Sequence, residues 1–309
     1  MSILTSASFI RCNKDESKID DKLKIKVRLP NGKLVAGKLC KYDLYYNIAV
    51  VNMKAFPELH AADIHNQVQA NGKLPQSKLV AIGRAFESGE LMATGGTLLY
   101  KTTKLDCQEL MTSTCKITKA GIGGPLVCYG GNFVGMSFYS KDGTPFLPIS
   151  LLLKCLTHFD IFGRVVQPWL GLRIGSLQAQ KLGIREVVHD TFPHAHAVYV
   201  EKVFDGSPAK DSGIKVGDVI TKLNEVALFS ATEFHEMVLD KTESTWRHGE
   251  GIPFEAFVLR PSDSSEFCTT IKAEVIDMSK INRWPVPKTK WLYPYDQPDV
   301  APVLSCFTD

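Results

Sequence analysis

Three histidines, His189, His194 and His196, lie close together in the stretch HDTFPHAH. Imidazole nitrogens are common zinc ligands, so this spacing raises the question of a metal site. Zinc sites are usually completed by further cysteine, histidine or carboxylate ligands, and no cysteine or carboxylate cluster accompanies these three. The sequence therefore predicts a polar loop here, with no bound metal and no other cofactor.

Cysteine side chains are the other group with intrinsic reactivity. None of the eight has CxxC spacing, and residues 1–10 lack a basic segment followed by a long apolar run. In a chain of this size without a secretory signal, scattered cysteines are typical of a reduced core, not of a disulfide framework. We expect a cytoplasmic or nuclear protein with free thiols at positions 12, 40, 107, 115, 128, 155, 268 and 306.

Composition limits the possible partners. The chain has 309 residues, 44% of them apolar and 22% charged, which indicates about two domains with sizeable cores. A net charge of +3 gives no electrostatic reason to expect nucleic-acid binding. No apolar stretch approaches the roughly 20 residues of a membrane-spanning helix.

Short strands broken by turns run from residue 22 to about 150. LKIKVRLP alternates with period two, Asn31-Gly32 predicts a hairpin turn, and KLVAGKLC is the returning strand. Further strand-like segments follow without intervening helices, which is typical of an antiparallel barrel or sandwich. Helical spacing first occurs at 149–159, and a helix there would close a first domain, assigned to residues 1–162.

A linker over 163–167 leads into a second unit, residues 168–276. It contains a strand at 197–204, a final pair of strands and two helices, the pattern of a small α+β barrel. The tail, 277–309, carries five prolines together with Trp284, Trp291, Tyr293 and Tyr295, so a regular helix or central strand is excluded. Packing of the tail onto a domain is favoured, and a partner-binding segment is the alternative.

The two helices of the second unit are marked by their caps. In SPAKDSG, Ser207 is the expected N-cap, Pro208 takes the first helical position and Gly213 ends the helix. Ser230 and Glu233 form a capping box that opens a helix over 230–241.

The order of these elements resembles a PDZ domain, and in particular the PDZ domains of the HtrA/Deg family of serine proteases. PWLGL, GSPAKDSGIKVGDVI and the capped helix carry the resemblance. It implies that Gly171 shapes a loop whose backbone N–H groups receive a peptide's terminal carboxylate. The peptide would then add as a strand between this loop's strand and the helix. The expected peptide-binding residues are Trp169, Leu170, Gly171, Leu172, Phe234, His235, Met237 and Val238.

The first unit resembles the trypsin-like domain of the same family, segment by segment. ILTSASFI is similar to ILTNAHVV, with Ser8 where the family carries its catalytic histidine. YNIAVV is similar to DIAVL, with Asn47 in place of the aspartate, and AGIGGPLV is similar to GNSGGPLV, with Ile122 at the nucleophile. The expected fold is therefore mainly β: a degenerate trypsin-like double β-barrel followed by an α+β PDZ domain.

Each of the three substitutions removes a chemical role. Ile122 has no nucleophilic atom, Ser8 cannot act as a base near neutral pH, and Asn47 cannot carry the charge that stabilises an imidazolium. Ala120 and Gly121 replace the Gly-Asn that precedes the nucleophile, so the former oxyanion loop is expected to be remodelled. A cysteine nucleophile at 115 or 128, served by a histidine at 60 or 65, is conceivable, but nothing in the spacing directs these residues to the former site.

The chain begins almost on the segment that corresponds to the catalytic histidine. The family normally has about two strands before it, so the sequence is either a truncated product or a first barrel with an open edge that needs a partner strand. A missing N-terminal segment would also remove any targeting signal.

The resemblance leads to an adaptor or regulatory subunit, an inactive relative whose PDZ domain binds protein C-termini or unfolded hydrophobic segments. It could form homo-oligomers or hetero-oligomers with related proteins. An active serine endopeptidase of the same family is the alternative, and a decayed gene product without a specific role is a third possibility.

Overall fold

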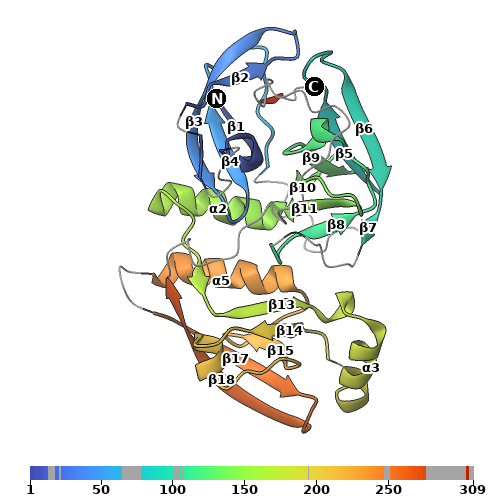
Figure 1. Ribbon diagram of the computed structural model, residues 1–309, viewed down its shortest axis with the longest axis vertical. Helices are drawn as coiled ribbons and strands as arrows, with labels where there is room; N and C mark the ends of the chain where they lie inside the picture. The colour runs from blue at the N-terminus through green and yellow to red at the C-terminus, as the bar shows by residue number, and fades with distance from the viewer. Residues whose placement is uncertain are drawn as a thin grey trace.

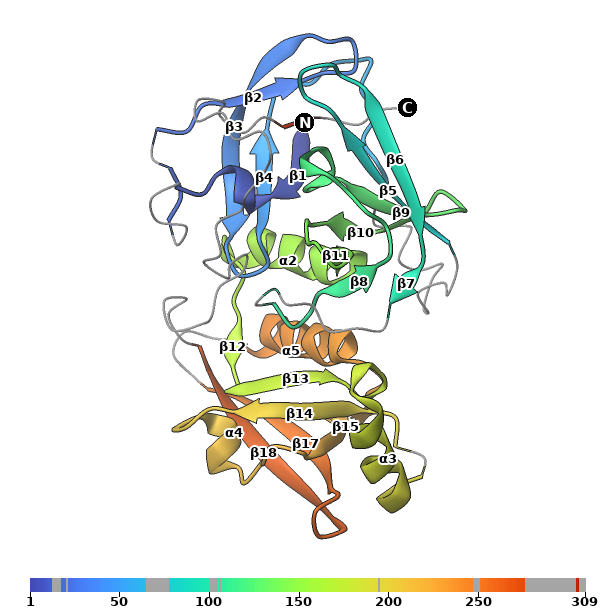
Figure 2. The same ribbon diagram turned by 45° about the vertical axis from the view of Figure 1, so that its right-hand side comes forward.

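Three β-sheets make up the described part of the chain, two in the first unit and one in the second (Figure 1). The computed structural model describes residues 1–12, 18–20, 22–64, 78–99, 105, 107–193, 195–246, 251–275 and 304–305. The two sheets of the first unit curl and face each other, as the turned view in Figure 2 shows, in the manner of a trypsin-like fold.

The first sheet has the order β1-β4-β3-β2-β19. The predicted hairpin is confirmed: β2 and β3 pair antiparallel, and Gly32 adopts φ +83° in the turn between them. β19 comes from the tail and lies parallel to β2, with Leu304 opposite Val27. The strands are β1 (Ser2–Ser6), β2 (Ile25–Arg28), β3 (Leu34–Asp43), β4 (Ile48–Asn52) and β19 (Leu304–Ser305). The rest of the tail from residue 276 lies outside the described residues.

The second sheet has the order β6-β5-β9-β10-β11-β8-β7. Its strands are β5 (Leu79–Arg84), β6 (Leu91–Gly96), β7 (Leu98–Leu99), β8 (Met111–Ser113), β9 (Pro125–Cys128), β10 (Phe133–Ser137) and β11 (Thr144–Pro148). The helix expected at 149–159 follows as α2 (Ile149–Phe162). Gly163, at φ +72°, ends it and donates its N–H to the Phe159 carbonyl at 3.1 Å.

The second unit is one antiparallel sheet with the order β12-β18-β17-β15-β14-β13, in which β16 also pairs with β15. Its strands are β12 (Pro168–Trp169), β13 (Leu172–Ser176), β14 (Val198–Val203), β15 (Val219–Leu223), β16 (Val226–Ala227), β17 (Ile252–Arg260) and β18 (Ser265–Val275). Its helices are α3 (Leu182–Thr191), α4 (Pro208–Asp211) and α5 (Ala231–Thr245). β13 therefore lies at an edge of the sheet.

Both predicted helix caps are confirmed. Ser207 Oγ accepts a hydrogen bond from Lys210 N at 3.2 Å, and Ser230 Oγ accepts one from Glu233 N at 3.2 Å. The return half of the capping box differs, because the Glu233 carboxylate accepts from Phe229 N at 2.7 Å. α5 also continues four residues beyond the predicted end at 241.

The helix α3 corrects the prediction of a polar loop. His189 lies in the last turn of α3, whereas His196 is exposed just before β14. Lys181, at the N-cap, makes no side-chain capping bond, so the usual sequence signal for a helix start is absent. His194 lies outside the described residues.

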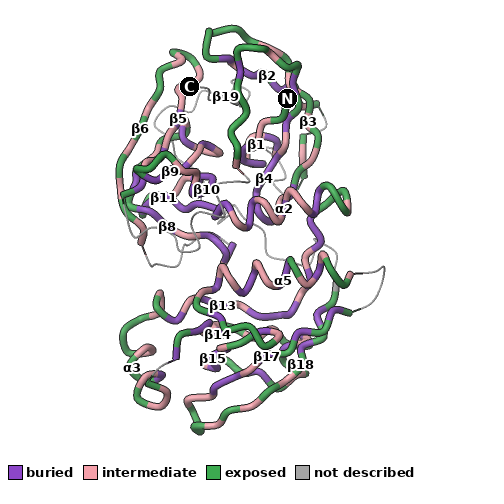
Figure 3. The backbone as a smooth tube through the Cα atoms, turned by 180° about the vertical axis from the view of Figure 1, so that it is seen from behind, coloured by how far each residue is buried: buried purple, intermediate pink, exposed green. Residues whose placement is uncertain are grey.

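The two units pack through α2 and α5, which lie side by side in Figures 1 to 3. Leu239 of α5 is 1% exposed and belongs to the apolar core of the first unit. His158 Nε2 lies 3.2 Å from the Leu239 carbonyl, and the Phe162 and Trp246 rings meet edge to face at 5.2 Å. Two polar contacts flank them, Ser150 with Glu236 and Lys154 with Asp240. None of the described helices is long and apolar enough to span a membrane.

Candidate functional site

Two of the three positions that correspond to a catalytic triad, Ser8 and Asn47, are hydrogen-bonded to each other. Ser8 lies in a single turn of 3₁₀ helix after β1, and Asn47 immediately precedes β4. Asn47 Nδ2 donates to Ser8 Oγ and to Ser6 Oγ, both at 2.8 Å. The Ala7 amide donates to the Asn47 carbonyl at 2.9 Å, which fixes the two segments together.

Asn47 is fully buried and has φ +54°, a left-handed conformation that Asn tolerates better than most residues. The side-chain oxygen of Asn47 contacts Arg11: Arg11 Nε and Nη2 each lie 3.4 Å from Asn47 Oδ1. Nη2 also donates to the Leu44 carbonyl at 2.7 Å. Both the nitrogen and the oxygen of the Asn47 side-chain amide thus take part in a structural hydrogen-bond network.

Ile122 follows a 3₁₀ turn, Lys119–Gly121, in the loop before β9. The next residue, Gly123, has φ +71°, and a Cβ there would lie 2.5 Å from Thr5 Oγ1 and 2.7 Å from Ser6 N. The loop is therefore pressed against β1 beside the Ser8 turn. Gly123 is required by this close backbone approach, independently of any catalytic role.

The backbone N–H groups of the former oxyanion loop donate hydrogen bonds within their own turn. Ala120 N donates to Thr118 Oγ1 at 3.3 Å, Gly121 N to the Thr118 carbonyl at 3.0 Å, and Ile122 N to the Lys119 carbonyl at 3.2 Å. An oxyanion hole needs such donors directed at the position where negative charge develops. In this conformation the three amides are directed at protein oxygens.

The groups considered as replacements for the triad do not assemble with it. Cys115 and Cys128 are free, buried thiols in the apolar core of the second sheet. His60 is exposed, and His65 lies outside the described residues. Among the described residues, no cluster of three or more histidine, cysteine or carboxylate side chains could hold a metal ion.

A second site lies where β13 faces α5, the place expected for a bound peptide. A cavity of about 130 Å³ opens there, lined by seven of the eight expected residues: Trp169, Leu170, Gly171, Leu172, Phe234, His235 and Val238. Met237 does not line it and packs instead against the apolar core of the second unit. We call this cavity the groove.

The loop at the end of the groove is fixed by its carbonyl groups. The Leu170 carbonyl accepts from Ala209 N at 3.0 Å, and the Gly171 carbonyl from Phe204 N at 3.0 Å. Across a trans peptide the N–H points opposite to the C=O. The amides of Gly171 and Leu172 therefore point away from these partners, as a carboxylate-binding loop requires.

Gly171 cannot be replaced by another residue without moving this loop. Its φ is +76°, and a Cβ would lie 2.0 Å from the Cβ of Ser207, the N-cap of α4. Any side chain would separate the loop from α4.

The first unit also contributes to the groove, which the sequence did not indicate. Tyr45, Tyr46 and Gln108 line it, as does Gln167 of the linker. Ile174 N donates to Gln108 Oε1 at 2.7 Å, and Gln108 Nε2 lies 3.5 Å from the Leu172 carbonyl. One side-chain amide thus pairs with the edge of β13 as a neighbouring strand would. No local pattern marks Gln108, because its role depends on how the two units pack.

Next to Gln108, Glu109 is 1% exposed and collects hydrogen-bond donors from both units. Tyr45 Oη donates to Glu109 Oε1 at 2.9 Å and Cys107 Sγ to Oε2 at 3.1 Å, while His235 Nδ1 lies 3.2 Å from Oε1. Burial raises the pKa of Tyr45 and of Cys107 well above their usual values, and the nearby Glu109 raises both further. A thiol held protonated in this way is not a nucleophile.

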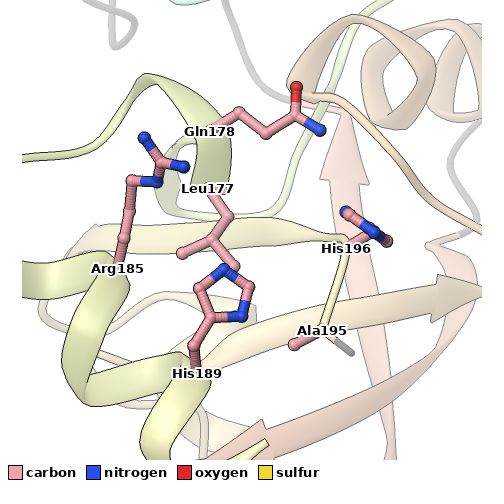
Figure 4. Close-up of a pocket in the computed structure, with 6 residues that line it drawn as sticks. All are labelled: Leu177, Gln178, Arg185, His189, Ala195 and His196. Atoms are coloured by element: carbon pink, nitrogen blue, oxygen red, sulfur yellow. The ribbon is translucent and has the colours of Figure 1, made fainter. Parts of the chain in front are cut away.

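A separate cavity of about 460 Å³ lies beside α3, away from the groove residues. Figure 4 shows its lining side chains: Leu177, Gln178, Arg185, His189, Ala195 and His196. Leu177 and Ala195 form a buried apolar floor, and the polar side chains surround it.

The curled sheets with a glycine-rich loop between them, and the edge strand facing a capped helix, define a trypsin-like peptidase fold joined to a PDZ domain. Two family models agree: the trypsin-like peptidase domain matches residues 2–136, and the PDZ domain matches residues 180–245.

Comparison with known proteins gives relatives among Do-like and HtrA-type proteases. The chain is 28% identical over 213 residues to "Putative protease Do-like 14" of Arabidopsis thaliana, covering 65% of this chain and 49% of that protein. It is 27% identical over 252 residues to serine endoprotease DegS of Haemophilus influenzae, covering 76% and 67%. The solved structure of the HtrA-type protease AlgW with a tripeptide has a TM-score of 0.56 at 20% identity, covering 89% of this chain and 86% of that one.

The chain therefore combines a trypsin-like peptidase domain with a PDZ domain, and HtrA/Do-like proteins are its homologues. It spans about half the length of the Arabidopsis relative.

Proposed function

We propose that this protein is a catalytically inactive member of the HtrA/Deg family that binds peptides. Its PDZ groove takes C-terminal or extended hydrophobic segments, and the chain acts as an adaptor or regulatory subunit. The observation that carries the proposal is the contrast between the two sites. Ser8 and Asn47 are held in a hydrogen-bonded network and Ile122 has no nucleophilic atom, whereas the groove keeps its loop, edge strand and helix.

Two features of the former catalytic site support the absence of proteolysis. Transfer of a proton from a nucleophile needs a base with a pKa near the working pH, and Ser8 has none. The oxyanion loop adds a second obstacle, since the amides of Ala120 and Ile122 are already bonded to protein oxygens.

The groove has the features by which PDZ domains capture a peptide strand. The edge of β13 offers backbone groups, and the apolar side chains of Leu170, Leu172 and Phe234 surround the cavity. A terminal carboxylate is served by the amides of Gly171 and Leu172.

Binding is tested on the full chain by fluorescence anisotropy with a library of labelled peptides with free, hydrophobic C-termini. We expect saturable binding that is lost in Gly171→Ala, where the new Cβ collides with Ser207. Gly206→Ala is the matched control, because Gly206 has φ +64° with nothing within 4 Å. Absence of saturable binding, or equal binding by both variants, would contradict the proposal.

The alternative, an active serine endopeptidase, is favoured by the names of relatives such as serine endoprotease DegS. Hydrolysis of unfolded casein by the full chain separates the two functions. We expect none above a buffer control. Casein hydrolysis that copurifies with the protein and changes in Ile122→Ala would support the endopeptidase.

A further inference from the structure

The cavity beside α3 has the size of a small-molecule site and is separate from the groove. Its volume of about 460 Å³ lies within the range of pockets that bind small ligands. None of the described residues that line it also lines the groove. A ligand in this cavity is therefore distinct from the peptide proposed for the groove.

The floor of this cavity is apolar and is held in place by the fold. Leu177 and Ala195 belong to one buried core cluster, together with Val188 of α3. Leu177 N donates to the Ala197 carbonyl at 3.0 Å, and Ala195 N donates to the Phe192 carbonyl at 3.1 Å. The floor therefore offers a fixed apolar contact to a ligand.

The side chains around the floor carry hydrogen-bond donors, and one of them is permanently charged. Arg185 and His189 are four residues apart, so both lie on the same face of α3. His196 and Gln178 lie across the floor from them, as Figure 4 shows. A guanidinium, two imidazoles and an amide thus surround one apolar surface.

No carboxylate among the described lining residues balances this charge. Glu186 and Asp190, the acidic residues of α3, are exposed and do not line the cavity. Arg185 Nε is buried and has no hydrogen-bond partner among the described residues. Leaving a buried donor of a charged group unpaired costs free energy, and an anion that accepts from it recovers that free energy.

The number of donors indicates which anion fits. A guanidinium binds two oxygens of a carboxylate or a phosphate at once. Both oxygens of a carboxylate would be occupied by Arg185, whereas a phosphate monoester has three free oxygens and nearly two negative charges, and so can also reach the imidazoles. We propose that this cavity binds a small phosphate monoester, with its phosphate on Arg185, His189 and His196 and its organic part on Leu177 and Ala195.

Isothermal titration calorimetry on the full chain tests the site, with phenyl phosphate as the probe. We expect saturable binding that is about tenfold tighter than that of inorganic phosphate, because the ring adds an apolar contact with the floor. Benzoate has one oxygen fewer and less charge, and should bind about tenfold more weakly than phenyl phosphate. Absence of saturable binding by phenyl phosphate, or equal binding by benzoate, would overturn the proposal.

Two variants of α3 separate the cavity from the general charge of the surface. Arg185→Lys keeps the positive charge but loses the planar fork, and should weaken binding of phenyl phosphate about tenfold. Lys181→Gln is the matched control, because Lys181 is exposed at the N-cap of the same helix and does not line the cavity. It should leave the affinity unchanged, and equal losses in both variants would overturn the site.

The histidines locate the ligand without any substitution, by NMR of the full chain labelled with ¹⁵N-histidine. Phenyl phosphate is expected to shift the signals of His189 and His196. It should leave those of His158 and His235, which are buried elsewhere, unchanged. Shifts at His158 or His235 without shifts at the other two would place the ligand outside the cavity and overturn the proposal.

Two other occupants are distinguished by the same readouts. Phosphatidic acid also carries a phosphate monoester, so pelleting with mixed vesicles of phosphatidylcholine and phosphatidic acid tests a lipid surface. We expect no pelleting, since the donors surround a cavity, and pelleting without binding of phenyl phosphate would overturn the small ligand. Zinc alone should not shift the signals of His189 and His196, and a zinc shift without a phosphate shift would assign the site to a metal instead.

Discussion

The amide of Ile174 donates to Gln108 Oε1 at 2.7 Å, so a side chain of the trypsin-like domain holds the free edge of the PDZ sheet. A peptide strand needs the same Ile174 amide. Gln108 and a ligand therefore compete for one backbone position, and affinity measured on the full chain includes the free energy of displacing Gln108.

Replacing Gln108 by Ala should strengthen peptide binding. Removal of one competing hydrogen bond is worth about 0.5–1.5 kcal/mol, or about two- to tenfold in Kd. Anisotropy titrations with one peptide on both proteins measure the change. Gln178→Ala, in the separate cavity beside α3, is the control and should leave Kd unchanged. Weaker binding by Gln108→Ala would mean that Gln108 supports the ligand instead.

Asp43 should make the protein less stable as pH rises through the mildly acidic range. Burial raises its pKa from 3.8 to about 6, against the hydrogen bond from Tyr46 N at 2.7 Å. Between these values the native state binds more protons than the unfolded chain. The free energy of unfolding therefore falls from about pH 4 to pH 6, by up to about 3 kcal/mol from this group.

Asp43→Asn isolates that contribution, since the amide oxygen can still accept from Tyr46 N. Urea unfolding should give similar stabilities for both proteins at pH 4 and a more stable variant at pH 7. Asp20 is exposed and accepts the same kind of bond from Lys22 N at 2.9 Å. Asp20→Asn should show no such pH-dependent gain. A wild-type stability that rises between pH 4 and 6 relative to Asp43→Asn would contradict the assignment.

Restoring the triad should not restore full activity. The triple variant Ser8→His, Asn47→Asp, Ile122→Ser supplies nucleophile, base and carboxylate, but the amides of residues 120 and 122 still point at Thr118 and Lys119. Loss of one oxyanion donor alone costs about 10²–10³ in turnover. Casein hydrolysis should stay at least that far below an active relative assayed in parallel. Comparable activity would show that the loop rearranges easily.

Ser207 should link the stability of the PDZ domain to ligand binding. It caps α4 through Lys210 N and lies 3.4 Å from the Gly171 carbonyl. Ser207→Ala should cost about 1–2 kcal/mol and also weaken peptide binding, because the loop loses a support. Ser230→Ala removes the cap of α5. Ser230 has no hydrogen bond to the loop among the described residues, so the change should cost about 1 kcal/mol with a smaller effect on Kd. Equal losses of affinity would exclude a specific role for Ser207.

Features that depend on local chemistry were predictable from the sequence. Ser207 and Ser230 cap their helices because a hydroxyl before a helical run satisfies free amides, and Gly171 adopts a conformation that other residues avoid. The helix α3 escaped prediction because its start carries no capping side chain.

The contribution of the first unit to the groove could not be predicted. Gln108 and Glu109 act only because the α2–α5 contact brings their segment onto β13 and His235, and no sequence periodicity encodes that contact. Helical spacing alone placed Met237 on the groove face, because it follows Phe234 by three residues. Its side chain packs against the domain core instead.

Leu239 has one further consequence. It is a residue of the PDZ helix whose side chain is enclosed by the core of the neighbouring domain. If the chain were cut at the 163–167 connection, Leu239 would face water on the isolated PDZ domain. The isolated first domain would have an empty space in its core where Leu239 had been. The domain boundary in the sequence is therefore not a point at which the two domains could be inherited separately. Recombination that exchanged the PDZ domain for an unrelated one would have to replace α2 together with it.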